Sequence, residues 1–304
     1  MDKKTVSLVL SSGGARGLTH IGAIEALLEN GFVIGSVAGT SMGALVGGVY
    51  ASGNLPAFKE FITSLNKVDV LRLMDLSINK KGIIKGEKVF TEMKKFVADI
   101  NIEDLPIPYT AIATDLTFHR EVIFNHGCLL DAIRASVAVP TVLLPFNHEQ
   151  SILVDGGIVN PLPLNRVNRR AGDLLVAINV NAPRTTALLA DKSKEKKSYK
   201  KLLNLVNRNW NNLLHEKPKR TIDAGFFDIL SGSIEMMQHK LTEYALHEMK
   251  PDMMVNIPVN SADMFEFYKA DELIKAGYEK MTEELKNFEN HKPMASHMVE
   301  EWHI

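Results

Sequence analysis

The sequence predicts an α/β sandwich with a mostly parallel central sheet, and three observations support this class. Short apolar runs of strand length alternate with segments of helical periodicity through most of the chain. Two glycine-rich turns each follow an apolar run and precede a helical segment, as in strand–turn–helix units. The 304 residues, 45% of them hydrophobic, can bury a sizeable core in one large domain or two small ones.

The individual elements follow from local periodicity and from turn residues along the chain. Strands are expected in the apolar run before Ser12 and at residues 33–38, 109–116, 121–124, 151–154, 173–180 and 252–257. Helices are expected at residues 18–30, 42–51, 55–65, 86–97, 129–138, 163–170, 222–249 and 270–288. Residues 68–85 are expected to be irregular, and we detect no internal repeat.

We divide the chain into a core of residues 1–182, a basic segment of residues 183–220, residues 221–290 that complete the same domain, and a loose tail of residues 291–304. The basic segment has 11 Lys and Arg against 3 Asp and Glu, in a chain with a net charge of −1. Its residues 199–214 place apolar side chains at helical spacing between basic ones. This pattern fits a surface helix packed by its apolar face, and it also fits a helix that contacts anionic lipid.

Composition and charge narrow the class of protein. The near-neutral net charge argues against a nucleic-acid partner. The single cysteine, Cys128, excludes an intramolecular disulfide and is expected to be a buried thiol. We find no signal peptide, and the apolar window at residues 34–51 is interrupted by Gly, Ser and Thr, so it is not expected to span a membrane. We therefore expect a cytoplasmic protein, with peripheral contact at the inner membrane face as an option.

The second glycine-rich turn carries a candidate nucleophile. Gly39, Ser41 and Gly43 fit the pattern G-x-S-x-G between an expected strand and an expected helix. In that context the pattern indicates a nucleophile elbow, because the glycines permit a tight, strained turn that presents the serine hydroxyl. Ser41 is therefore the candidate nucleophile.

The first glycine-rich turn is a candidate anion site. Gly13, Gly14 and Ala15 lie just before an expected helix, so their N–H groups can face a negative charge. Taken alone, the turn fits phosphate binding as well as oxyanion stabilisation. The Walker pattern is absent, and Ser12 stands where a dinucleotide fingerprint has its first glycine. The proximity of Ser41 favours the oxyanion role.

A serine nucleophile needs a group that accepts its proton. The histidines after residue 155 lie in the basic segment, on expected helices or in the tail, whereas Asp155 closes a strand and is followed by Gly156 and Gly157. A partly buried carboxylate at that position can act as general base. The alternative for Asp155 is an Asp-Gly turn that caps the next segment. Asp115, also at a strand end, is given a structural role because no glycine-rich turn follows it.

Five motifs occur in order along the chain. They are Gly13-Gly14-Ala15-Arg16-Gly17, Gly39-Thr40-Ser41-Met42-Gly43, Ala113-Thr114-Asp115-Leu116, Arg134-Ala135-Ser136 with Pro140, and Asp155-Gly156-Gly157 with Asn160-Pro161-Leu162-Pro163. Together they resemble the patatin-like phospholipase family over residues 6–180, with weaker similarity over residues 251–277. The resemblance implies a three-layer α/β/α fold and acyl-ester hydrolysis by a Ser–Asp dyad without histidine.

The resemblance also implies a role for each motif residue. The dyad maps onto Ser41 as nucleophile and Asp155 as general base, and neither a metal nor an organic cofactor is expected. The oxyanion loop maps onto Gly13, Gly14, Ala15 and Arg16, and the N–H of Met42 is a further candidate donor. Supporting glycines are Gly17, Gly39, Gly43, Gly156 and Gly157.

Some roles stay open at this point. Arg16 is expected to anchor the loop, with a substrate phosphate as its other potential partner. Ser12 replaces a glycine of the family motif and would be strained at positive φ. The same dyad serves acyl transfer as well as hydrolysis, and a regulatory protein with the fold or a nucleotide-binding protein are rival classes. The lipid or small-ester substrate and the oligomeric state are not defined by the sequence.

Overall fold

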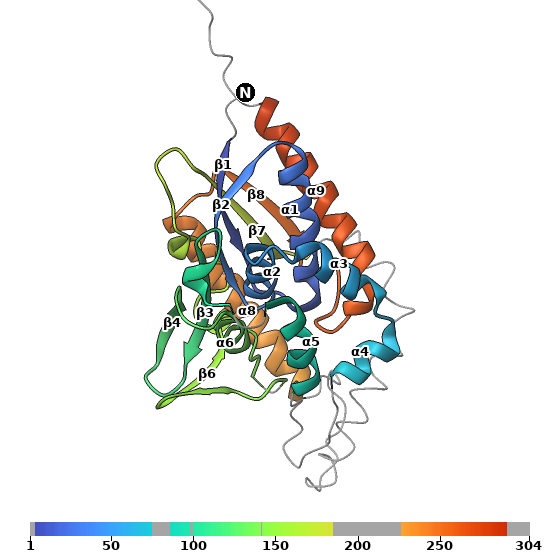
Figure 1. The fold of residues 1–304 in the computed structure, drawn as a ribbon, viewed down its shortest axis with the longest axis vertical. Coiled ribbons are helices and arrows are strands. Elements are labelled where there is room, and N and C mark those ends of the chain that lie inside the picture. The colour runs from blue at the N-terminus through green and yellow to red at the C-terminus, as the bar shows by residue number, and fades with distance from the viewer. Residues whose placement is uncertain (1–3, 75–85, 98–99, 141, 185–225, 291–304) are drawn as a thin grey trace, which may run out of the picture.

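The computed structural model of the chain describes residues 4–74, 86–97, 100–140, 142–184 and 226–290 (Figure 1). Its centre is one eight-stranded sheet in the order β5-β6-β3-β2-β1-β7-β8, with β4 beside β3. The strands are β1 (Thr5–Leu10), β2 (Val33–Thr40), β3 (Tyr109–Asp115), β4 (Arg120–Phe124), β5 (Phe146–His148), β6 (Ser151–Asp155), β7 (Leu174–Ala182) and β8 (Met253–Pro258). Strands β3, β2, β1, β7 and β8 run parallel, whereas β4, β5 and β6 add antiparallel pairs.

The helices lie on both faces of this sheet (Figure 1). They are α1 (Thr19–Glu29), α2 (Met42–Ala51), α3 (Leu55–Ser64), α4 (Lys67–Leu73), α5 (Glu87–Val97), α6 (Leu129–Ser136), α8 (Phe226–Glu248) and α9 (Ala270–Asn290). Short 3₁₀ turns are η1 (Gly14–Leu18), η2 (Ile102–Asp104), η3 (Gly156–Ile158), η4 (Leu164–Arg166) and η6 (Phe267–Lys269).

Alternation along the strands divides the core into two layers. In β1, Leu8 and Leu10 join a large core with α1, α2 and α9, whereas Val9 between them joins a second core on the opposite face. The second core also contains Leu175 of β7 and is packed by Leu246 of α8. Because successive strand residues point to opposite faces, both faces of the sheet are covered. The three-layer α/β/α prediction is confirmed.

Strand β3 determines which strand ends come together. Its residues 111–115 pair with β4 along one edge, so β2 and β6 must share the other edge. Along that shared edge Thr40 of β2 lies opposite Ile112, and Asp155 of β6 lies opposite Ala113. The carboxyl ends of β2 and β6 therefore approach each other from opposite directions and meet at neighbouring residues of β3.

Several local predictions are wrong. Within residues 68–85, α4 forms because Asn66 and Asp69 make a capping box, a start signal that the weak apolar pattern obscured. The expected helix at 163–170 is only η4, since Val167 already has extended backbone. Cys128 is exposed, because it is the N-cap residue of α6 and lies outside its buried face. Strand β5 is too short to give a periodic signal.

Residues 199–214 and the tail of residues 291–304, for which a basic amphipathic helix and a loose end are expected, lie outside the described residues. Within the part of the chain that the structure describes, no helix has the length and hydrophobicity needed to cross a membrane.

Candidate active site

The expected elbow forms between β2 and α2. Ser41 has φ 56° and ψ −122°, a conformation that is rare for a non-glycine residue and costs energy. The turn is tight: a Cβ added to Gly39 would lie 2.4 Å from the backbone of Gly43, and one added to Gly43 would lie 2.2 Å from the carbonyl oxygen of Leu10. Glycine at both positions therefore lets the chain reverse around Ser41, which is 5% exposed.

A second serine fixes the backbone of the elbow. The N–H of Ser41 donates a hydrogen bond to Oγ of Ser136 at 2.9 Å, and the Ser136 hydroxyl donates to the carbonyl oxygen of Ile112 at 2.6 Å. Ser136 is the last residue of α6 and is fully buried. Its hydroxyl thus ties the strained nucleophile to β3. The sequence did not reveal this role, although Ser136 belongs to one of the five motifs.

Replacing Ser136 with alanine is expected to lower kcat by about 10- to 100-fold with little change in KM. The substitution leaves the buried N–H of Ser41 without its acceptor, which costs about 1–3 kcal/mol, and it frees the elbow to leave its reactive conformation. Steady-state kinetics on a soluble p-nitrophenyl ester measures this effect.

A matched control is Ser7→Ala in β1. It removes a buried hydroxyl that donates a hydrogen bond to Oδ2 of Asp173 at 3.0 Å. That variant is expected to lose stability without losing kcat. Equal kcat losses in the two variants would contradict a positioning role for Ser136.

Asp155 ends β6 and is almost completely enclosed, with an exposed fraction of 4%. Its Oδ1 accepts a hydrogen bond from the N–H of Gly157 at 2.7 Å, whereas Oδ2 is buried without a well-formed hydrogen bond among the described residues. Burial raises the pKa of Asp155 to about 6, against opposing hydrogen bonds from Ser41 and from the Gly157 N–H. The Ser41 hydroxyl is therefore close enough to the carboxyl group to oppose this rise in pKa.

Three loops meet at this pair. A Cβ added to Gly17 would lie 2.4 Å from Cγ of Met42, so the first glycine-rich turn packs against the residue after the nucleophile. A Cβ added to Gly157 would lie 3.2 Å from Cβ of Ser12 and 2.9 Å from Oδ1 of Asp155. Gly156 in turn lies against the backbone of Ile112 in β3. These contacts together bring the glycine loop, the elbow and the Asp-Gly-Gly turn into one place, as the sequence predicts.

The N–H groups of the first turn are not all available to a ligand. The N–H of Ala15 donates to the carbonyl oxygen of Met264 at 3.0 Å, so Ala15 does not offer a free donor. Among the described residues, the N–H groups of Gly13 and Gly14 make no backbone hydrogen bond, and Gly14 has φ +55°, which glycine adopts without strain. As the first residue of α2, Met42 has no partner for its N–H within that helix. Gly13, Gly14 and Met42 are therefore the candidate donors.

Arg16 anchors the loop. Its Nε donates to the carbonyl oxygen of Val180 at 3.1 Å, and its two terminal nitrogens donate to the carbonyl oxygen of Ala262 at 3.2 Å and to Oδ1 of Asn181 at 3.0 Å. Burial of the guanidinium group lowers its pKa. Because the side chain is buried and three of its N–H groups donate inside the protein, Arg16 is a scaffold for the loop and offers little to a substrate phosphate.

Two further contacts hold the first turn, and the sequence did not indicate either. Nδ2 of Asn181 donates to the carbonyl oxygen of Ser12 at 2.7 Å, and Nε2 of His20 donates to that of Ser11 at 3.0 Å. Burial lowers the pKa of His20 to about 4, so the ring is neutral near pH 7. Ser12 is not among the described residues with positive φ, and the strain considered for a serine at this position does not arise.

Asp115 has the structural role that the sequence predicts. Its Oδ1 accepts hydrogen bonds from the N–H groups of Thr117 and Phe118, and its Oδ2 accepts from Ser151 and Arg120. Burial acts to raise its pKa, but these hydrogen bonds together lower it. Asp115 therefore stays ionised and organises the turn between β3 and β4.

Comparisons with known proteins show the family of the chain. The profile of the patatin-like phospholipase family matches residues 8–167, more than half of the chain. The chain belongs to this family. Members of the family hydrolyse lipid esters, and this chain is accordingly a lipid-ester hydrolase.

Similar proteins extend the match beyond the profile. An uncharacterised NTE family protein of Mycobacterium tuberculosis is 33% identical over 93% of this chain and 92% of its own length. The lysophospholipase NTE1 of Yarrowia lipolytica is 32% identical over 59% of this chain and 13% of its own length. Among solved structures, VipD of Legionella pneumophila is 14% identical, with a TM-score of 0.48, over 95% of this chain and 67% of that one.

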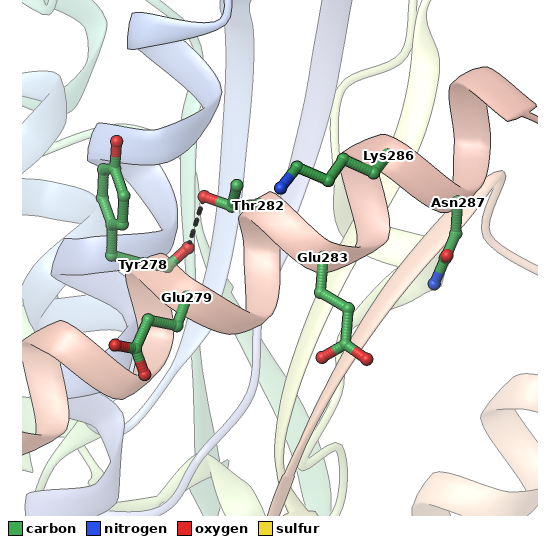
Figure 2. Close-up of a pocket in the computed structure, with 6 residues that line it drawn as sticks. All are labelled: Tyr278, Glu279, Thr282, Glu283, Lys286 and Asn287. Carbon is green, nitrogen blue, oxygen red and sulfur yellow. Dashed lines mark hydrogen bonds between the residues drawn. The ribbon is translucent and has the colours of Figure 1, made fainter.

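A hollow elsewhere on the surface does not belong to this site. It has a volume of about 340 Å³ and is lined by Tyr278, Glu279, Thr282, Glu283, Lys286 and Asn287 of α9 (Figure 2). This end of α9 lies near the start of β1, because Lys4 stacks over the ring of Phe288. Ser41 follows the carboxyl end of β2, which runs parallel to β1, and therefore lies at the opposite end of the strands. A groove formed along one helix, remote from Ser41, is not a candidate for the ester-binding site.

Proposed function

We propose that this lipid-ester hydrolase works through a catalytic dyad of Ser41 and Asp155, with phospholipids or lysophospholipids as substrates. The observation that carries the proposal is the meeting of β2 and β6 along one edge of β3. This pairing brings the elbow serine close to a buried carboxylate whose Oδ2 accepts no hydrogen bond from the described residues. The lysophospholipase activity named for the Yarrowia relative agrees with this substrate class.

The mechanism uses few groups. Oδ2 of Asp155 accepts the hydroxyl proton as Oγ of Ser41 attacks the ester carbonyl carbon. The N–H groups of Gly13, Gly14 and Met42 stabilise the negative oxygen that forms, each donor being worth several kcal/mol when preorganised. The proton passes from Asp155 to the leaving alcohol as the ester C–O bond breaks. Water then attacks the acyl group on Ser41, gives a proton to Asp155, and releases the fatty acid as the proton returns to Oγ.

Labelling with a fluorophosphonate tests the identity of the nucleophile directly. We expect wild-type protein to gain one probe mass, and the modified peptide to contain Ser41. Parallel assays with a phospholipid and a lysophospholipid in detergent micelles show which substrate is preferred. A label on another residue would refute the dyad, and ester turnover with no free fatty acid but a new acylated alcohol would favour acyl transfer.

The pH dependence of turnover follows from the burial of Asp155. A general base works only when ionised, and burial raises the pKa of this carboxyl group to about 6. We therefore expect kcat/KM for a soluble ester to fall tenfold per pH unit below about 6 and to level off above it. A profile with its midpoint near 4, the value of an ordinary Asp, would show that Asp155 is not the titrating base.

The basic segment adds an electrostatic proposal. If residues 199–214 contact lipid at the inner membrane face of a cytoplasmic enzyme, binding to vesicles should depend on anionic lipid and weaken with salt.

A further inference from the structure

Helix α8 carries four exposed large apolar side chains on one face, three of them the most exposed large apolar side chains among the described residues. Ile229, Met236, Met237 and Tyr244 have exposed fractions between 52% and 70%. At 100° per residue they fall within an arc of about 100° on the helix surface, which they share with the exposed side chains of Ser233, Lys240 and His247. We call these four residues the outer face of α8. An exposed apolar group of this extent on a described helix indicates a contact with a partner or a lipid surface.

The opposite side of α8 lies against the catalytic loop. A Cβ added to Gly157 would lie 2.5 Å from Nε2 of Gln238, which points away from the outer face in the helical projection. One turn further along, Thr242 is buried, and Ala245 and Leu246 pack on the second core with residues of β1 and β7. The same helix therefore contacts the loop of Asp155 with one side and presents apolar side chains with the other.

A lipid surface is the occupant that these observations favour. The substrate is a lipid ester, and the dyad side chains are only 4–5% exposed, so the substrate has to be delivered to the edge of an enclosed site. Residues 185–225, which end where α8 begins, contain ten Lys and Arg and four Asp and Glu, a charge that suits anionic headgroups.

A second copy of the chain fits less well. Four side chains of this size, half to two-thirds exposed, present on the order of 500 Å² of surface. Stable dimers of standard size bury about 800 Å² per partner. The outer face of α8 is therefore small for a dimer interface, whereas interfacial helices bind lipid with comparable apolar faces.

We propose that the outer face of α8 docks on the surface of a phospholipid bilayer and thereby holds the catalytic loop next to the lipid esters. The proposal rests on the lipid-ester activity given above, but it concerns binding and not the dyad. Its contact is apolar, so it should persist in about 1 M salt, where the Debye length falls to ~3 Å and the contribution of the basic segment is screened.

The test uses full-length protein with Ser41→Ala, so that binding is measured without hydrolysis. Sedimentation with vesicles of phosphatidylcholine and phosphatidylglycerol, at low salt and at about 1 M salt, compares this protein with the M236E/M237E variant. We expect the variant to bind about tenfold or more weakly at both salt concentrations, because two charges replace apolar contacts. With Ser41 intact, M236E/M237E should lose turnover of vesicle phospholipid by a similar factor and keep turnover of a soluble p-nitrophenyl ester.

The control is Leu28→Glu, which puts one such charge on an apolar residue of α1 that is 41% exposed and lies outside α8. It should bind vesicles like wild type, and I229E/Y244E, at the two ends of the outer face, should repeat the loss. Unchanged vesicle binding of M236E/M237E would overturn the proposal. A lower unfolding temperature of M236E/M237E would also overturn it, because it would mean that the chain itself covers the outer face of α8. A change of this variant from dimer to monomer would overturn it as well, because the face would then be a dimer interface. If the wild-type protein did not turn over the soluble ester, the dyad would be contradicted. The binding test would still hold, because it uses the Ser41→Ala protein.

Discussion

Replacing Ser41 with alanine is expected to lower turnover of a soluble ester by about four orders of magnitude or more and to abolish labelling by a fluorophosphonate. The loss is this large because a Ser–Asp dyad acts as a unit, and the activity left without the nucleophile comes from binding and the oxyanion donors alone. Alanine lacks the attacking oxygen but keeps the turn, since Ser136 binds the backbone N–H of residue 41 and not its side chain. Intact-mass measurement and initial rates, on the same preparations, give both readouts.

The control for this variant is Ser52→Ala, which removes a hydroxyl at the other end of α2 that donates to the carbonyl oxygen of Val49 at 2.9 Å. It should retain labelling and turnover within about twofold, as surface substitutions away from a site do. Labelling that persists in Ser41→Ala would place the nucleophile at another residue. The strained conformation of Ser41 would then have no role in catalysis.

The elbow could be predicted from sequence because its determinants are local. Gly39 and Gly43 flank Ser41 within five residues, between a strand pattern and a helix pattern, so spacing alone specifies the turn. The bounds of α2 were predicted in full for the same reason. The conformation of a motif can be predicted from sequence when neighbouring residues in the chain determine its backbone.

Contacts between distant segments could not be predicted in this way. The link from Ser41 to Ser136 spans 95 residues, and the tie between Asn181 and Ser12 spans 169. Both depend on the order of strands in the sheet, which no local pattern encodes. The sequence indicates Asp155 as a strand-end carboxylate before a Gly-Gly turn, but no local pattern shows that β6 runs antiparallel to β3 and so meets the carboxyl end of β2.

The first turn shows the same limit within a single motif. Sequence pattern treats the N–H groups of Gly13, Gly14 and Ala15 alike, but Met264, far along the chain, accepts from one of them. The guanidinium group of Arg16 is likewise directed inward by acceptors on and after β7. A motif thus indicates which residues form a loop, and the tertiary contacts decide which of its donors remain for a ligand.

Replacing Asp155 with asparagine is expected to lower kcat for a soluble ester by about three to four orders of magnitude, because the amide retains the size of the carboxyl group but cannot accept the proton of Ser41. The loss should be as large at pH 8 as at pH 6, since the variant has no base to ionise. Labelling by a fluorophosphonate should slow by a similar factor without disappearing. Full labelling and turnover in Asp155→Asn would show that Ser41 is activated by another group.

The same substitution is expected to change the pH dependence of stability. Burial raises the pKa of Asp155 to about 6 in the folded protein, above the ~3.9 of an unfolded Asp, so the folded state binds more protons between these values. The contribution of Asp155 to the stability of wild type therefore decreases as pH rises from about 4 to 6, and the decrease is complete above that window. At about 1.4 kcal/mol per pKa unit, the free energy of unfolding of Asp155→Asn relative to wild type should increase by roughly 2 kcal/mol between pH 4 and pH 7, because the unfolded Asp is already half ionised at pH 4.

Urea unfolding at several pH values measures this difference, and Asp115→Asn provides a control of opposite sign. Hydrogen bonds lower the pKa of Asp115, so its carboxylate stabilises the folded protein above the unfolded pKa and that stability is lost as pH falls. The relative stability of Asp115→Asn should therefore decrease with rising pH, whereas that of Asp155→Asn increases. A pH-independent difference for Asp155→Asn would mean that the folded protein holds this carboxylate ionised at no cost. Burial would then not raise the pKa of Asp155, and the predicted decline of kcat/KM below about pH 6 would not be expected either.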